Sequence, residues 1–270
     1  MKKTAIFLAF LFLLGMTACK NDSDVTEPTA PTQPQTKTVY VHASITQEYG
    51  STINRTEYLF DVRNHVNQVV IYTNGEETKR HGVLCDENGN YVKWISGGSV
   101  TEYSYDDQGH SLGMSVYIND VLISSTQYTW ENGLRTSVTT KMENQGITQR
   151  ILMTYDHSGR LLRQDTYTAD TLSSYSIYTT DEAGRTTSVM VYQPDGTLLS
   201  TSTYTREGTT ETITATQPDG TVNQTAVLTY DEHGNLLTQE IYNSSGQLIS
   251  KETHTWKAVV VPYDCPRASV

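Results

Sequence analysis

Four aspartates recur at equivalent places in the chain and are the first residues that could do chemistry. Asp106, Asp156, Asp181 and Asp231 each precede a glycine by three residues. A row of carboxylates could bind calcium or supply a catalytic acid and base. No turn has the dense acidic loop that calcium sites need, however, and aspartate commonly begins turns by accepting hydrogen bonds from backbone N–H groups. We therefore predict a structural role for these aspartates.

The histidines and serines have no catalytic or metal-binding spacing. His110, His157 and His233 lie in or next to expected turns, far apart in the sequence. The chain has no His-x-x-x-His, no serine nucleophile elbow and no phosphate-binding glycine loop. We predict that the protein is not an enzyme and holds neither a metal nor a cofactor.

Cys85 and Cys265 are candidates for a disulfide. A disulfide can form if the chain is exported. In a flat sheet, however, about twelve strands spaced roughly 4.8 Å apart would separate the two thiols by roughly 60 Å. A bridge therefore requires the sheet to curl or the C-terminal tail to return. Two unpaired buried thiols are the alternative.

The tyrosines form two columns. Tyr117, Tyr167, Tyr192 and Tyr242 share one repeat position, and Tyr103, Tyr128 and Tyr178 share another. In an array of hairpins, one position recurs on every second strand, about 9.6 Å apart. Rings at that interval could stack on successive sugars of a glycan, so the first column is our candidate binding site. The alternative is that tyrosine fills a half-buried face and keeps its hydroxyl in water.

A repeat of 25 residues positions these side chains. Each unit has two turns, such as Tyr155–Gly159 and Gln217–Gly220, in which Asp, Pro and Gly have known turn roles. The runs between turns are rich in Val, Ile, Thr and Tyr, which suit strands. Turns every 12 or 13 residues leave no room for a crossover helix, so neighbouring strands are antiparallel. We predict an all-β fold: a meander of roughly twelve to sixteen strands in one long, twisted or curled sheet. The residues that begin the first turn of each unit are Tyr105, Trp130, Tyr155, Thr180, Thr205, Tyr230 and Thr255.

Two units carry the pattern Tyr-Asp-x-x-Gly-Arg/Asn-Leu, at Tyr155–Leu161 and Tyr230–Leu236. This motif resembles the YD repeat of RHS proteins, and the resemblance covers about residues 100–255. It implies a long sheet that spirals into a hollow shell, often around a C-terminal toxin. This chain departs from the family in its longer period and in the short segment, 257–270, that follows the repeats. We therefore expect no toxin and only part of a shell.

The N-terminus resembles the leader of a bacterial lipoprotein. Lys2 and Lys3 precede an apolar run, Ala5–Leu14, that is too short to span a bilayer. The run Leu14–Cys19 resembles the lipobox, with Met16 as its imperfect position, which makes Cys19 the predicted lipidation site. The acidic residues after Cys19 resemble the signal that directs Bacteroidetes lipoproteins to the outer face of the outer membrane. The resemblance implies an outer-membrane lipoprotein that is anchored by its lipid and exposed at the cell surface.

These features divide the chain into five parts. We predict a signal peptide (1–18), a Pro/Thr-rich tether (19–37), irregular hairpins that cap the array (38–100), the repeats (101–256) and a C-terminal tail (257–270).

The charge of the chain limits its partners. Removing residues 1–18 removes two lysines and changes the net charge from −11 to −13. An acidic body repels nucleic acid, which is therefore excluded as a partner. The expected partners are the membrane, through the lipid anchor, and a glycan or a host or envelope protein. We predict a non-catalytic surface binding or adhesion module. The alternatives are a structural or assembly component of the cell envelope without a soluble ligand, and a hydrolase whose site the sequence hides.

Overall fold

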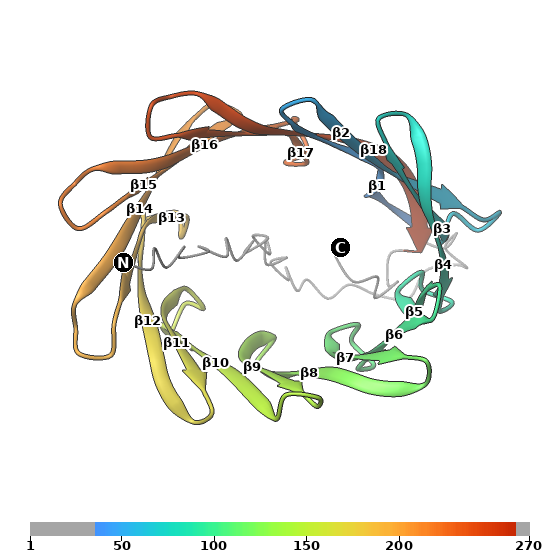
Figure 1. Cartoon of the computed structure of the whole chain (residues 1–270), viewed down its shortest axis with the longest axis horizontal. Coiled ribbons are helices and arrows are strands. Elements are labelled where there is room, and N and C mark those ends of the chain that lie inside the picture. The colour runs from blue at the N-terminus through green and yellow to red at the C-terminus, as the bar shows by residue number, and fades with distance from the viewer. Residues whose placement is uncertain (1–35, 263–270) are drawn as a thin grey trace, which may run out of the picture.

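The computed structural model describes residues 36–262, which form one sheet of 18 antiparallel strands. Each strand pairs with the next along the chain, and β1 also pairs with β18 from Thr36↔Pro262 to Glu48↔Lys251. This last pairing closes the sheet into a barrel (Figure 1). The strands are β1 Thr36–Tyr49, β2 Thr52–Phe60, β3 Val66–Thr73, β4 Glu76–Cys85, β5 Tyr91–Ser96, β6 Ser99–Tyr105, β7 Ser111–Ile118, β8 Val121–Glu131, β9 Leu134–Met142, β10 Ile147–Tyr155, β11 Leu161–Thr168, β12 Thr171–Thr180, β13 Thr186–Tyr192, β14 Leu198–Glu207, β15 Thr210–Thr216, β16 Val222–Tyr230, β17 Leu236–Asn243 and β18 Leu248–Pro262.

Closure confirms the antiparallel meander and corrects three expectations. The sheet curls completely, instead of forming part of a shell. It has 18 strands, more than the twelve to sixteen predicted. The strands β1–β5 complete the wall beside the repeats, so residues 38–100 do not cap a free end. A closed sheet has no edge strand that needs a cap.

The turns that follow even-numbered strands lie at one rim, which we call the Asp rim; those that follow odd-numbered strands lie at the opposite rim. Six turns of the Asp rim share one geometry within residues 36–262. An aspartate N–H donates to the carbonyl four residues on, and the N–H three residues on donates back to the aspartate carbonyl. These turns begin at Asp61, Asp86, Asp106, Asp156, Asp181 and Asp231.

Several other connections are two-residue turns with positive φ. Asn74 and Gly75, a residue pair that favours two-residue hairpin turns, have φ values of 51° and 87°. Asp120 and Asp170, which stand where the second turn of other repeat units has glycine (Gly146, Gly196, Gly220 and Gly246), have φ values of 64° and 63°. Aspartate tolerates this left-handed conformation better than most residues, which explains the substitution.

The two faces of the sheet differ in composition. Residues paired across neighbouring strands share a face, as in the row Glu211–Leu228–Gln239. Most buried side chains lie on the face of this row, which we call the inner face because the concave side of a closed sheet crowds its side chains. The buried members are Val69, His81, Val83, Thr126, Met153, Gln164, Val189, Glu211, Ala215, Ala226, Leu228, Gln239 and His254. The outer face carries threonines and ion pairs such as Lys93–Glu102 and Lys251–Glu240.

Apolar packing is densest on the inner face near the Asp rim. Val66, Val69 and Val83 form a buried cluster there, and Tyr58, Phe60, Cys85, Tyr91 and Trp94 pack against it. Within residues 36–262, no helix has the length and apolarity needed to cross a membrane.

Candidate functional site

The two predicted tyrosine columns lie on opposite faces of the barrel wall. Tyr103, Tyr128 and Tyr178 pair with Met114, Val138 and Val189 in rows of the inner face. Tyr117, Tyr167, Tyr192 and Tyr242 alternate with inner-face residues and therefore point outward. Of the two columns, only the one that contains Tyr117, Tyr167, Tyr192 and Tyr242 is presented to a large partner outside the barrel.

The inner aromatic residues stabilise the wall. The Tyr155 hydroxyl donates to the Arg135 carbonyl at 2.7 Å, and Trp130 and Trp256 donate to the carbonyls of Ser111 and Leu236 at the same distance. Burial raises the pKa of Tyr178 to about 12, and its hydroxyl lies 3.3 Å from Gln164 Oε1. These rings are half-buried, with their polar atoms satisfied, as the structural alternative expects.

The outward tyrosines gather at the rim opposite the Asp rim. Each stands at a register shift near the end of its strand, and each of the four predicted members faces a leucine on the next strand (Leu122, Leu172, Leu198 and Leu248). Their predicted spacing is correct only for Tyr167 and Tyr192, on β11 and β13. Tyr117 on β7 and Tyr242 on β17 are each four strands from the nearest predicted member. The ladder is therefore interrupted at β9 and β15.

Arginines cover part of this column. The Arg163 guanidinium lies 4.2 Å from the Tyr175 ring centroid, and Tyr175 stacks on Tyr192 with centroids 5.0 Å apart and planes 15° apart. Arg150 lies 5.1 Å from the Tyr167 ring centroid. Tyr175 is thus held between Arg163 and Tyr192. Of the two stacked rings, a ligand can reach at most that of Tyr192. Cation–π contacts of this kind hold the rings in fixed orientations.

A fifth outward tyrosine at a register shift, Tyr72 on β3, is not predicted by the 25-residue repeat. It stands 45 residues before Tyr117, which is not a multiple of the 25-residue period. It nevertheless has the same place at a register shift near the opposite rim. Tyr72 lines a groove of about 400 Å³ together with Thr46, Ile53, Arg55, Glu57 and Gly75.

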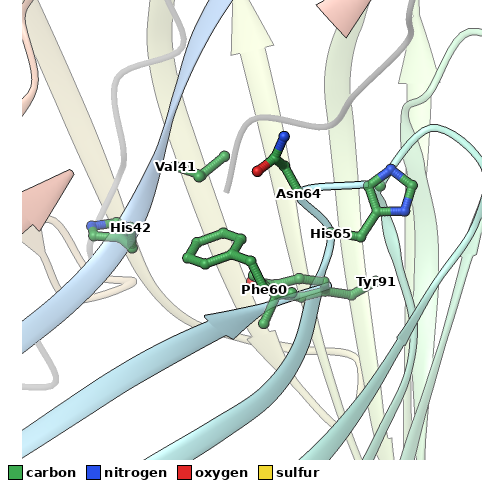
Figure 2. Close-up of a pocket in the computed structure, with 8 residues that line it drawn as sticks. Val41, His42, Phe60, Asn64, His65 and Tyr91 are labelled. Atoms are coloured by element: carbon green, nitrogen blue, oxygen red, sulfur yellow. The ribbon is translucent and has the colours of Figure 1, made fainter. Parts of the chain in front are cut away.

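A second, smaller cavity lies at the Asp rim (Figure 2). It has a volume of about 20 Å³, room for about one water molecule, and its walls include Val41, Phe60 and Tyr91. Lys257 Nζ lies 4.2 Å from the Phe60 ring centroid and 2.9 Å from Asn64 Oδ1. The lysine ties β18 to the turn between β2 and β3, so this cavity belongs to the packing of the barrel seam.

The turn aspartates act as predicted, through the backbone. Asp156 Oδ1 accepts hydrogen bonds from the N–H groups of Ser158 and Arg160, at 2.8 and 2.9 Å. Asp106 and Asp231 repeat this pair of bonds. The Arg160 N–H and the Ser158 hydroxyl hold the pKa of Asp156 below its ordinary value. The carboxylates are occupied by their own turns.

We expect Asp156→Ala to lower the melting temperature without creating or removing any response to calcium, because the side chain satisfies backbone donors. Thermal unfolding followed by circular dichroism, with calcium and with a chelator, measures both effects. Glu182→Ala, an exposed acidic neighbour at the same rim, is the control. A melting temperature that rises with calcium in the parent and not in Asp156→Ala would contradict the structural role.

The remaining predicted groups lie apart. His110 contacts Asp106 at 2.9 Å and stacks on Trp130, while His233 stacks on Tyr40, each with ring centroids 4.7 Å apart. Residues 36–262 contain no group of three His, Cys, Asp or Glu side chains suited to a metal.

Of the three cysteines in the predictions, the structure describes Cys85. Cys85 ends β4, and its thiol lies 3.2 Å from the Val66 carbonyl oxygen. Cys19 and Cys265 lie outside the described residues, as do the signal peptide and most of the tether and tail. Lipidation of Cys19 and a bridge between Cys85 and Cys265 stay predictions.

Known proteins resemble this chain only weakly. A family model described as "Uncharacterised protein" matches residues 101–216. No curated protein matches the chain. A solved structure titled TcdB2-TccC3 is 14% identical over 73% of this chain, with a TM-score of 0.26, and this chain spans 15% of its length.

Two solved structures from Bacteroides are similar over most of their own length. A porin-like protein from Bacteroides uniformis is 12% identical, with a TM-score of 0.31. The match covers 80% of this chain and 96% of the Bacteroides uniformis protein. A protein of unknown function from Bacteroides fragilis is 16% identical, covers 52% and 92%, and has a TM-score of 0.26. Because these TM-scores are low, the fold assignment depends on this chain's own strand pairing.

Proposed function

We propose that this protein is a non-catalytic surface module that binds glycan through the aromatic residues of its outer face. The outward tyrosines at the opposite rim carry this proposal: Tyr72, Tyr117, Tyr167, Tyr192 and Tyr242. A pyranose ring presents an apolar C–H face that stacks on an aromatic ring, and arginine and carboxylate groups beside it bind hydroxyls. The outer face carries both aromatic rings and charged side chains near the rim opposite the Asp rim.

The lipid on Cys19, rather than the barrel wall, is the proposed link to the outer membrane. The outer face carries cross-strand ion pairs, such as Lys93–Glu102 and Lys251–Glu240, each at 2.8 Å. A wall in contact with lipid has an apolar outer band, so an outer face with these charges belongs in water. The part of the predicted tether (19–37) that precedes β1, which begins at Thr36, would then hold the barrel at the cell surface. Kinship with the YD repeats of RHS proteins is part of the same proposal and is supported by the shared turn motif.

Glycan binding is tested with the chain lacking residues 1–18 on an array of plant, host-mucin and microbial glycans. We expect a specific signal that the triple variant Tyr167→Ala, Tyr192→Ala and Tyr242→Ala loses or weakens at least about tenfold, because three stacking rings are removed. Circular dichroism confirms that the variant is folded.

The matched control replaces three outer-face threonines of β14 and β15, Thr201, Thr203 and Thr214, by alanine. This control should bind as the parent does. If the tyrosine variant loses stability and the parent binds no glycan, the second candidate gains support: a structural component of the envelope in which Tyr–Leu pairs stabilise the hairpins.

A further inference from the structure

The groove beside Tyr72 differs from the rest of the outer face in shape. Its lining includes the row Thr46–Arg55–Tyr72 across β1, β2 and β3, and Glu57 from the neighbouring row Glu57–Val70–Arg80. Ile53, 46% exposed, adds apolar surface at the rim. The volume of about 400 Å³ lies in the range of small-molecule sites, roughly 300–1,000 Å³.

The side chains around the groove are held in place. Arg80 forms a fork with Glu77, at 3.0 and 2.8 Å, and donates to Gln68 Oε1 at 2.7 Å. Val70, although it belongs to an outward row, has 0% exposure. The network of Arg80, Glu77 and Gln68 therefore covers an apolar centre beside the groove.

Tyr72 is the outward tyrosine with both a groove and an accessible ring. Among the residues that the structure describes, neither a cation nor another ring stacks on Tyr72, whereas Arg150 covers Tyr167 and Tyr175 covers Tyr192. Burial and the nearby Glu57 carboxylate raise the pKa of Tyr72. Its hydroxyl is thus kept protonated beside Glu57, and Tyr72 itself lines the groove.

The charges around the groove select against anionic sugars. Arg55 Nη2 lies 2.7 Å from Glu57 Oε1, and Arg80 is paired with Glu77, so both guanidinium groups are already neutralised. Glu48 lies between Ile53 and Lys251, and the Lys251 ammonium is already bonded to Glu240. An anionic sugar would meet this surface without an available cation, while the hydroxyls of a neutral sugar can share the paired groups.

We propose that this groove is the primary saccharide subsite and that it takes a neutral pyranose segment, with one sugar stacked on Tyr72 and its hydroxyls bonded to Arg55, Glu57 and Thr46. The proposal rests on the glycan-binding function above and narrows it to one site and one class of sugar. The tyrosines farther round the rim would then contact more distant parts of the same chain.

The test is titration calorimetry of the chain lacking residues 1–18 with maltotetraose, cellotetraose and mannotetraose, and with trigalacturonate as the anionic probe. We expect at least one neutral probe to bind and trigalacturonate not to bind. Tyr72→Ala should weaken binding at least about tenfold, while Tyr72→Phe, which keeps the ring, should stay within about twofold. Melting curves of both variants establish that they are folded.

Thr203→Ala, an outer-face substitution on β14 outside the groove, is the control. It should bind as the parent does. Equal affinity of Tyr72→Ala and the parent, equal losses in Tyr72→Ala and Thr203→Ala, or tighter binding of trigalacturonate would each overturn the subsite. Those results leave the proposed function standing if the array signal still depends on Tyr167, Tyr192 and Tyr242, whereas an array without any signal removes the function itself.

Discussion

Replacing Gly113 by alanine is expected to destabilise the barrel by about 4 kcal/mol, the sum of a strained backbone and a steric overlap that each cost about 1–3 kcal/mol. Gly113 lies in β7 with φ +153°, and a Cβ atom there would stand 2.1 Å from the Thr126 carbonyl oxygen and 3.2 Å from the Gln127 Cα. Both neighbours are backbone atoms of β8, which cannot rotate away as a side chain can. Urea unfolding followed by tryptophan fluorescence measures the loss.

The control for this effect is Gly146→Ala. Gly146 also has a positive φ, +62°, but a Cβ atom there has no neighbour within 4 Å. Its cost is limited to the left-handed backbone, about 1 kcal/mol. Equal losses in the two variants would show that β7 and β8 can separate by the required distance. A much larger loss at Gly113, up to failure to fold, would support a closed wall in which β7 is held by β6 and β8 together.

The local structure of this barrel follows from its sequence because turns are local. Asp156 and Asp231 bond to N–H groups two and four residues away, and Asn74-Gly75 needs only its own backbone preference. A five-residue pattern is therefore enough to predict a turn. Turns separated by one strand length then predict antiparallel pairing without further information.

Closure could not be predicted from the same patterns, because it depends on residues more than 200 positions apart. The Ser44 hydroxyl lies 2.9 Å from that of Thr255, and Gln47 donates to Glu252 at 2.7 Å. No turn or periodicity specifies such pairs. The strand count was underestimated for a related reason: the first hairpins depart from the repeat, as where Asn64 takes the place of glycine in the turn that begins at Asp61.

The candidate site was predicted in part. The repeat separated the tyrosines into two columns, but both faces of the sheet carry tyrosine, so the sequence assigned neither column to a face. Tyr72 was missed because a register counted in steps of 25 residues does not reach it. Counting turns instead of residues would have found it, since Tyr72 precedes the Asn74-Gly75 turn as Tyr117 precedes the turn at Asn119 and Asp120.

The seam between β1 and β18 should make the barrel sensitive to acid. His42 Nε2 lies 3.2 Å from His254 Nδ1 across the seam, and His254 Nε2 lies 2.9 Å from Glu252 Oε1. His42 also packs on Trp256, with ring centroids 3.8 Å apart, and faces Tyr58 on β2. Burial and the neighbouring His254 lower the pKa of His42 to about 4 from an ordinary value of 6.5, although Glu252 opposes them.

The unfolded chain therefore binds a proton at His42 that the folded barrel does not bind between pH 6.5 and about 4. Stability is complete above pH 6.5 and is lost as the pH falls toward 4, by about 2 kcal/mol once solvent access to the ring is allowed for. Urea midpoints measured at intervals from pH 7.5 to 4 should show this fall in the parent. His42→Gln, which retains a donor for His254, should flatten it, while the exposed control His157→Gln should leave it unchanged. A parent whose midpoint stays level over this range, or a His42→Gln variant as acid-sensitive as the parent, would show that the seam tolerates two charged imidazoles.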